Sequence, residues 1–492
     1  MNAQVRRVAS VVLVGFFILF AAPFYWQVLA SDRLNGDPRN SRVLIKEYSI
    51  ERGQMVLPDG KPVARSVATK DQLKFQRQYP QGPSYGMITG FDSLVFGRTL
   101  AESRFNSFLL GKAPEQFAQN VSDLLTARPN PGGTLVLTLD PAAQRAAEQA
   151  LGNRKGAVVA LEPSTGKVLA MTTFPRYNPN ALSSHDTDKV RAAWNQLNKD
   201  PGKPLLNRAA GELYPPGSTF KIITAAAALS SGLHPDTARP NEHTYKPPQT
   251  TREIQNFGGE NCFGGKDPLT MAEALQVSCN TWFAHLGVDL KTPTLVGMAE
   301  KFGLNDSAHF QLPGAAQSDI PSELDPPSLA QSAIGQRDVR VSPLQMASVI
   351  ATIANGGGRM APYVVDRVLS PDGSKTVKRF EPESLGETVS PEVADQLKQM
   401  LLGVVNGPEG TGSAAQIPGL EVFGKTGTAQ HGADEPPHAW FVGATTGKAG
   451  KSIAVAAIVE DGGELGSEAT GGRVAAPIVR SVMEAYLNGG SR

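Results

Sequence analysis

The feature that most constrains this chain is the stretch 214–232, which reads Tyr-Pro-Pro-Gly-Ser-Thr-Phe-Lys and then Ile-Ile-Thr-Ala-Ala-Ala-Ala-Leu-Ser-Ser-Gly. The Pro-Pro-Gly cannot continue a preceding helix, whereas the alanine-rich run is a strong helix former that ends at Gly232. Ser218 is therefore predicted to open a helix, with Lys221 one turn along the same face. The sequence thus places a hydroxyl beside a candidate base.

The environment of Lys221 decides what this pair can do. An apolar helix gives the lysine few waters, and desolvation favours the neutral amine, which can accept a proton from Ser218. The competing interpretation is an ordinary serine-capped helix whose lysine extends to the surface. Because Ser-x-x-Lys occurs by chance in many chains, the catalytic interpretation depends on further motifs.

The N-terminal region indicates on which side of the membrane the rest of the chain lies. Residues 8–30 contain no charged residue, and they are long enough to cross a bilayer as a helix. Arg6 and Arg7 precede this run, so the positive-inside rule leaves the first residues in the cytoplasm and the rest of the chain outside. A cleaved signal peptide ending at Val28-Leu29-Ala30 is the alternative. The anchor is favoured because the apolar run exceeds the usual signal-peptide core of about 7–15 residues and carries aromatic residues at 24–26.

Composition narrows the class of protein. The 492 residues are 40% hydrophobic and 19% charged, which allows a large core spread over two or three domains. The net charge of +1 and the lack of a basic run give no electrostatic footprint for nucleic acid. The only cysteines are Cys262 and Cys279. Outside the membrane a disulfide between them is the default expectation, and two free buried thiols are the alternative.

The apolar patterns predict an α+β architecture with strands near both ends of the second region and helices between them. A helix from 141 to 151, capped by Asp140, closes the first region. The expected later elements are strands at 156–161 and 167–173, helices at 269–288 and 343–353, a three-strand meander at 420–428, 439–445 and 452–460, and a final helix at 475–487. The expected division is a cytoplasmic tail (1–7), a transmembrane anchor (8–30), an N-terminal domain (31–152) and a catalytic domain (153–492).

Two further short motifs join Ser218 and Lys221. Ser278-Cys279-Asn280 is expected within the helix at 269–288, and Lys425-Thr426-Gly427-Thr428 lies on the first strand of the meander. Each alone carries little weight, since the first is usually a cap or turn and the second a strand edge. In this order, on these elements, they match the motif set of penicillin-binding proteins and serine β-lactamases.

With Pro-Pro-Gly-Ser-Thr-Phe-Lys, Ser-Cys-Asn and Lys-Thr-Gly-Thr-Ala, the chain resembles the class B penicillin-binding proteins. The Asp-Pro-Arg-Asn after the anchor, the cysteine pair and Ala-Leu-Glu-Pro-Ser-Thr-Gly at 160–166 make it most similar to actinobacterial A-type members. The resemblance implies a β-lactamase-like transpeptidase fold, with an antiparallel sheet between helices and a helical subdomain. It also implies an elongated, mostly β pedestal domain before it, of the kind that serves dimerisation, and one transmembrane helix.

The resemblance implies a D,D-transpeptidase that cross-links peptidoglycan stem peptides ending in D-Ala-D-Ala and is acylated by β-lactams. Ser218 would be the nucleophile, Lys221 the base and Ser278 a proton relay. Asn280 would bind the stem peptide, and Lys425 would place positive charge near the terminal carboxylate. These five residues would form the core of the site.

The Lys-Thr-Gly-Thr strand would supply the rest of the substrate contacts. Thr426 and Thr428 would donate hydroxyl hydrogen bonds, and Gly427 would let the substrate backbone approach. The backbone N–H groups of Ser218 and Thr428 would form the oxyanion hole. A Cys262–Cys279 disulfide would reach into this site and position Ser278 and Asn280.

The implied surroundings are a cell-membrane location with the catalytic domain outside, a separate glycosyltransferase and other wall-synthesis membrane proteins. No cofactor, metal or nucleic acid is expected. His431 and His438, which flank an acidic loop, are interpreted as surface or hydrogen-bonding residues rather than metal ligands.

Four alternative functions fit the sequence less well. A serine β-lactamase shares the motifs, but no Glu-x-x-x-Asn occurs where its deacylating loop would fall. A non-enzymatic sensor would need an intracellular output that the short cytoplasmic segment does not supply, and a scaffold would be free to lose Ser218 or Lys221. A Ser-His-Asp hydrolase lacks its Gly-x-Ser-x-Gly signature.

Overall fold

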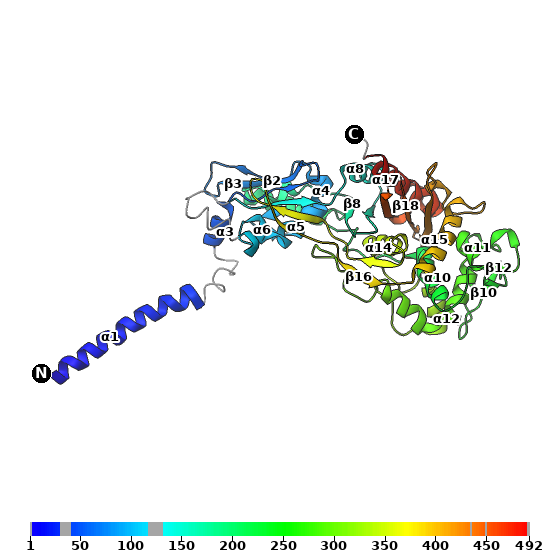
Figure 1. Ribbon diagram of the computed structural model, residues 1–492, viewed down its shortest axis with the longest axis horizontal. Helices are drawn as coiled ribbons and strands as arrows, with labels where there is room; N and C mark the ends of the chain where they lie inside the picture. The colour runs from blue at the N-terminus through cyan, green and yellow to red at the C-terminus, as the bar shows by residue number, and fades with distance from the viewer. Residues whose placement is uncertain (1, 30–40, 117–130, 433–434, 448–449, 490–492) are drawn as a thin grey trace.

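The computed structural model describes residues 2–29, 41–116, 131–432, 435–447 and 450–489 (Figure 1). Helix α1 (Asn2–Phe24) continues into a π-helical turn η1 (Tyr25–Leu29) and extends away from the rest of the protein. Its side chains are exposed, and it is long and apolar enough to cross a membrane. Helix α1 begins six residues before the predicted apolar run of residues 8–30. The last residue of that run and residues 31–40 lie outside the described residues.

The N-terminal part is built on a six-stranded sheet with the order β15-β14-β6-β1-β2-β3. Its strands are β1 (Met55–Val56), β2 (Pro62–Ala68), β3 (Phe75–Gln78), β6 (Thr134–Leu137), β14 (Val365–Leu369) and β15 (Thr376–Arg379). Only β1 and β6 pair in parallel. The predicted boundary near residue 152 stays a prediction, and two strands that follow it in sequence complete this sheet.

Short elements surround the sheet. They are α3 (Ser41–Tyr48), α4 (Gly82–Thr89), β4 (Asp92–Ser93), β5 (Gly97–Arg98), α5 (Leu100–Arg104), α6 (Asn106–Leu109) and η2 (Pro114–Gln116). The polar centre of this region is Glu102, whose fully buried carboxylate accepts hydrogen bonds from Arg52 Nε and Arg77 Nε, each at 2.6 Å. Burial raises the pKa of the Glu102 carboxyl, but Arg77 and Arg52 together hold that pKa below its usual range.

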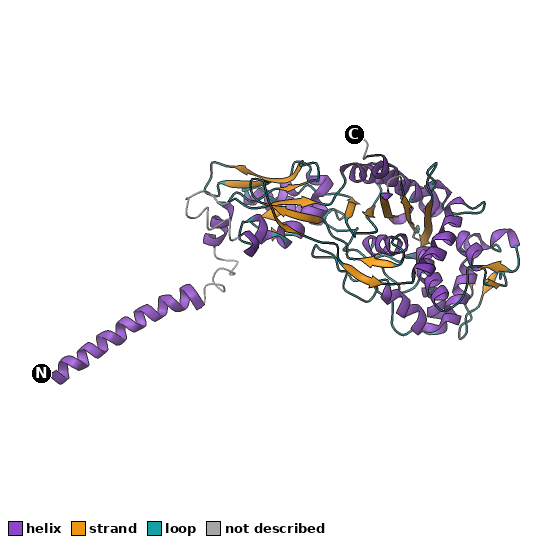
Figure 2. Cartoon of the chain, in the orientation of Figure 1, coloured by secondary structure: helices purple, strands orange, loops and turns teal. Residues whose placement is uncertain are grey.

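The C-terminal part is built on a five-stranded antiparallel sheet with the order β17-β18-β19-β7-β8 (Figure 2). These strands are β7 (Gly156–Leu161), β8 (Val168–Phe174), β17 (Val422–Ala429), β18 (His438–Thr446) and β19 (Ser452–Val459). The predicted hairpin and the predicted meander are both present, and β19 joins them by pairing with β7. β17 forms one edge of the sheet.

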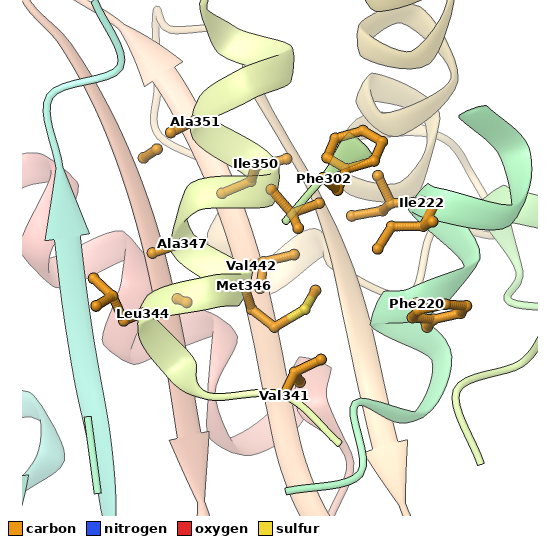
Figure 3. Close-up of a cluster of buried hydrophobic side chains, with 14 of the residues drawn as sticks. Phe220, Ile222, Phe302, Val341, Leu344, Met346, Ala347, Ile350, Ala351 and Val442 are labelled. Carbon is orange, nitrogen blue, oxygen red and sulfur yellow. The ribbon is translucent and has the colours of Figure 1, made fainter. Parts of the chain in front are cut away.

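Helices cover both faces of this sheet, which confirms the predicted sandwich. α8 (Pro141–Leu151) and α17 (Ala476–Asn488) pack on one face, and α14 (Pro343–Ala354) packs on the other. Asp140 caps α8 as predicted, accepting hydrogen bonds from two backbone N–H groups of its first turn. In Figure 3, Met346 and Ile350 of α14 lie beside Val442 of β18 and face the side chains of Phe220 and Ile222. This apolar layer fixes the helix that follows Ser218 against the sheet.

A helical subdomain lies at the end of the molecule opposite the N-terminal sheet (Figure 1). It contains α10 (Lys221–Ser230), α11 (Met271–Gln276), α12 (Asn280–Lys301), α13 (Pro326–Ser332) and α15 (Pro391–Asn406). Its small strands are β9 (Ala238–Arg239), β10 (Thr244–Tyr245), β11 (Ile254–Gln255) and β12 (Leu269–Thr270). The remaining elements are η3 (Pro179–Leu182), α9 (Thr187–Lys199), η4 (Gly217–Phe220), η5 (Phe257–Gly259), η6 (Phe263–Gly265), β13 (Gly358–Met360), β16 (Ser384–Glu387), η7 (Ser413–Ala415), η9 (Glu460–Glu468) and α16 (Gly471–Val474).

The prediction of one helix at 269–288 is wrong. The structure has two helices, α11 and α12, which are separated at Ser278, where the backbone has a φ of 63°. A non-glycine residue in this left-handed region interrupts helical hydrogen bonding and is uncommon outside functional or strained sites. The break places Ser278 and Cys279 between the two helices, and Asn280 is the first residue of α12.

Replacing the buried carboxylate tests the polar centre of the N-terminal region. Glu102→Ala leaves Arg52 and Arg77 buried without their shared partner, so we expect the free energy of unfolding to fall by about 3–5 kcal/mol. In the parent protein the depressed pKa of Glu102 contributes stability at neutral pH that is lost as the pH falls through that pKa. Denaturant unfolding of the full chain in detergent measures both effects.

The matched control is Glu115→Ala, because Glu115 forms a partly exposed pair with Lys378 at 3.8 Å. Its loss is expected to cost less than about 1 kcal/mol. Equal effects of the two substitutions would contradict a structural role for the buried cluster.

Candidate functional site

Ser218 lies in the 3₁₀ turn η4, immediately before α10, so the predicted helix start is confirmed with a tighter first turn. The turn is pressed against β17. Gly217 has a φ of 53°, and a Cβ there would lie 2.8 Å from the carbonyl oxygen of Thr428. Gly217 also donates its N–H to the carbonyl of Gly335 at 2.8 Å. Ser218 itself is half-buried, so this residue of the packed turn remains partly exposed to a substrate.

Lys221 is fully buried and points toward the second motif. Its Nζ donates to the carbonyl oxygen of Ser278 at 2.6 Å and to Oδ1 of Asn280 at 2.7 Å, and it lies 3.4 Å from Ser278 Oγ. Among the described residues, none of its hydrogen bonds goes to Ser218 Oγ. A neutral amine has two N–H bonds and one lone pair. The two close acceptors therefore use both N–H bonds and leave the lone pair for a proton.

Ser278 connects the two lysines. The left-handed backbone at Ser278 directs its carbonyl to Lys221, while its Oγ accepts a hydrogen bond from Lys425 Nζ at 2.8 Å. Asn280 begins α12, and its Nδ2 donates to the carbonyl of Gln255 at 3.1 Å. This contact orients Asn280 so that Oδ1 faces Lys221.

The third motif lies on edge strand β17, beside η4. Lys425 Nζ also donates to the carbonyl of Thr426 at 3.1 Å. A Cβ on Gly427 would lie 2.9 Å from Thr219 Cγ2 and 3.0 Å from the carbonyl oxygen of Pro216. Glycine is therefore required for the Ser218 turn to lie against the strand. Thr428, the next residue, is half-buried.

Burial sets the protonation of both lysines. It lowers the pKa of Lys425 to about 7. Burial also lowers the pKa of Lys221 well below its usual value, and the positive charge of Lys425 lowers that pKa further. The lowered pKa favours the neutral form of the Lys221 amine, which is able to act as a base.

The predicted disulfide is present between Cys262 and Cys279, whose Cα atoms are 5.8 Å apart. The alternative of two free thiols is therefore wrong. Because Cys279 is the middle residue of the second motif, the bridge ties the loop that carries Cys262 directly to Ser278 and Asn280.

The histidine cluster does not favour a metal centre. His431, His438 and Asp461 bring three ligand-type atoms within 4.8 Å of one another. However, His438 Nδ1 accepts the backbone N–H of Asp461 at 3.2 Å, and its ring stacks on that of His431 with 3.8 Å between centroids. The lone pair that a metal would need is already used. Burial and the neighbouring His431 lower the pKa of His438 to about 4.

The structure brings all eight predicted site residues together and adds residues that the motifs do not contain. Thr411 Oγ1 lies 2.7 Å from Thr426 Oγ1 and fixes the orientation of that hydroxyl. Gln255 and Gly335 contribute the carbonyl oxygens described above. Thr411 and Gly335 lie in turns, and Gln255 ends the short strand β11, all outside the three motifs. Gln255 and Gly335 act through the main chain, so no side-chain signal identifies them.

Two family models match the chain. The model of the penicillin binding protein transpeptidase domain matches residues 156–484, which is more than half of the chain. The chain belongs to the penicillin-binding protein transpeptidase family. The model of the penicillin binding protein A dimerisation domain matches residues 52–135, within the N-terminal part. The family predicted from the three motifs is confirmed.

Similar members of this penicillin-binding protein family come from mycobacteria. The chain is 42% identical over its full length to the full-length peptidoglycan D,D-transpeptidase PbpA of Mycolicibacterium smegmatis. It is 40% identical to PbpA of Mycobacterium tuberculosis, over 99% of this chain and all of the relative. These matches confirm the expected likeness to actinobacterial A-type proteins.

Solved structures agree with this assignment. The ceftriaxone acyl-enzyme complex of M. tuberculosis penicillin-binding protein A superposes with a TM-score of 0.84 at 39% identity, covering 90% of this chain and 100% of that one. Its penicillin G acyl-enzyme complex gives 0.82 at 38% identity, covering 89% and 100%. The transpeptidase fold and the domain that precedes it are therefore shared along nearly the whole chain.

Proposed function

We propose that this protein is a serine-type peptidoglycan D,D-transpeptidase, in which Ser218 forms an acyl-enzyme with the stem peptide and with β-lactams. The proposal is carried by two sets of contacts. Lys221 contacts the Ser278 carbonyl and Asn280, and Lys425 contacts Oγ of Ser278. These contacts join three motifs that are far apart in sequence. The acyl-enzyme complexes of the M. tuberculosis relative support the same chemistry.

The first half of the reaction is acylation. Neutral Lys221 accepts the proton of the Ser218 hydroxyl as Oγ attacks the carbonyl of the penultimate D-alanine. Ser278 Oγ, which lies between the two lysines, relays a proton to the departing amine. The C–N bond breaks, the terminal D-alanine leaves, and an ester to Ser218 remains. In the second half, an amine of another stem peptide attacks this ester, and the proton path runs in reverse to release the cross-linked product and free Ser218.

Residues on two sides of the site bind the substrate. Asn280 hydrogen-bonds the stem peptide, while Lys425, Thr426 and Thr428 bind the terminal carboxylate. The backbone N–H groups of Ser218 and Thr428 stabilise the oxyanion, and one such donor is typically worth about 3 kcal/mol of barrier. Gly427 contributes by its lack of a side chain, since this lets the nucleophile's turn and the binding strand meet.

The proposed setting is the cell membrane. α1 crosses the bilayer with its N-terminus in the cytoplasm, and the catalytic part, from about residue 153 onward, lies outside. The matched dimerisation domain supports an N-terminal domain of about residues 31–152 that holds the catalytic part away from the membrane. A separate glycosyltransferase polymerises the glycan strands, and other wall-synthesis membrane proteins recruit this chain.

Acylation by a penicillin tests the nucleophile. Intact-mass analysis of the full chain is expected to show one covalent adduct that survives for minutes to hours, because no Glu-x-x-x-Asn occurs in the sequence where the deacylating loop of a class A β-lactamase would fall. Ser218→Ala is expected to form none. Rapid turnover of the adduct would indicate a β-lactamase, and an adduct that persists in Ser218→Ala would overturn the assignment of Ser218.

The pH dependence of acylation tests the lysine pair. The rate is expected to fall as the pH drops through the lowered pKa of Lys221, because the protonated amine cannot take the serine proton. Lys425→Met removes the positive neighbour that lowers the pKa of Lys221. The acid limb of the curve of acylation rate against pH should therefore move to higher pH. Stopped-flow acylation at a series of pH values measures the shift.

The control for this measurement is Lys425→Arg, which keeps a positive charge at the same position. Its acid limb should stay near that of the parent, whatever happens to the maximal rate. Equal movement of the limb in both variants would show that the charge of Lys425 does not act on Lys221.

A further inference from the structure

The capping residue of α12 supplies no side-chain acceptor for the first backbone N–H groups of the helix. The first backbone N–H groups of a helix have no partner within that helix, and a side chain of the capping residue usually supplies one. Here the capping residue is Cys279, whose sulfur is bonded to Cys262, and its side chain makes no capping hydrogen bond. The acceptor must come from elsewhere.

The acceptor is Asn256, at the end of strand β11. Its Oδ1 accepts the backbone N–H of Asn280 and that of Thr281, both at 3.0 Å. Its Nδ2 donates to the carbonyl of Glu260 at 3.2 Å, which fixes the orientation of the carboxamide. Asn256 is only 8% exposed, so water cannot easily replace either contact.

The preceding residue acts on the same target. The carbonyl of Gln255 accepts Nδ2 of Asn280, and Oδ1 of Asn280 accepts Lys221 Nζ. The dipeptide Gln255-Asn256 therefore holds both the main chain and the side chain of Asn280. A shift of Asn256 would therefore displace Asn280, which contacts the Lys221 amine that takes the serine proton.

We propose that Asn256 is a positioning residue for acylation, which caps α12 from outside the helix and so holds Asn280 against Lys221. This inference rests on the proposed function. Asn256 touches neither the nucleophile nor the lysines, so it acts only through the second motif. A neutral carboxamide suits the task, because it accepts two N–H groups without placing a negative charge near Lys221, where such a charge would favour the protonated amine.

A matched pair of variants separates positioning from simple stabilisation. Asn180, in η3, is half-buried; its Oδ1 accepts the backbone N–H of Tyr79 and its Nδ2 donates to the carbonyl of Tyr79, both at 2.8 Å, and it has no hydrogen bond to the second motif. Asn256→Ala and Asn180→Ala therefore remove side-chain to backbone hydrogen bonds of the same kind. We compare the saturating acylation rate constant of the full chain with a fluorescent penicillin, corrected for folded protein by the final amplitude, and we record the melting temperature of each variant.

Asn256→Ala is expected to lower the saturating rate constant by about tenfold or more, since small displacements of a reacting group are costly. Asn180→Ala should change it by less than about twofold, even if both variants melt at lower temperature. Asn256→Asp keeps an acceptor oxygen, so it should recover part of the rate and should serve if Asn256→Ala does not fold. Its acid limb should also move to higher pH.

Equal rate losses in Asn256→Ala and Asn180→Ala, or an unchanged rate in Asn256→Ala, would overturn the positioning role. Failure of Asn256→Asp to exceed Asn256→Ala would overturn it as well. The proposed function fails separately, if the parent protein is not acylated or if Ser218→Ala still is.

Discussion

The site depends on the burial of two lysines in one place without a counter-charge. Among the described residues, no carboxylate forms an ion pair with Lys221 or Lys425, and both side chains are fully buried. Burying an unpaired charge is costly, and a buried lysine avoids that cost by releasing its proton. The arrangement therefore produces a base at neutral pH from a residue that is ordinarily protonated. The two acceptors around Lys221, Ser278 and Asn280, satisfy its N–H bonds without restoring the charge.

Several features of the fold follow from this requirement. The break between α11 and α12 exposes the Ser278 carbonyl that Lys221 needs, which an unbroken helix would bond internally. Gly217 and Gly427 allow the Ser218 turn and β17 to approach within contact distance, so that Lys425 reaches the same hydroxyl. The apolar layer around Met346 and Ile350 holds α10 in place, and with it Lys221 (Figure 3).

Local sequence signals predicted much of this structure. The capped helix after Asp140, the meander and the helix start at Ser218 each follow from patterns within a few residues. The break at Ser278 does not, because the left-handed serine has partners that come from elsewhere in the chain, namely Lys221 at its carbonyl oxygen and Lys425 at its Oγ. For the same reason the direct Ser218–Lys221 contact expected from helical spacing is replaced by contacts of Lys221 with the second motif. The insertion of β14 and β15 into the N-terminal sheet likewise has no local signal.

The central claim, that Lys221 is neutral in the resting protein, is tested most directly by NMR titration of the side-chain carbon next to the amine in protein labelled with ¹³C-lysine. Lys221→Arg and Lys425→Arg variants assign the two resonances. The account predicts that the Lys221 resonance titrates well below the range of exposed lysines, and that the Lys425 resonance titrates near 7. A Lys221 resonance that titrates with the exposed lysines, near their ordinary pKa of about 10.4, would contradict it.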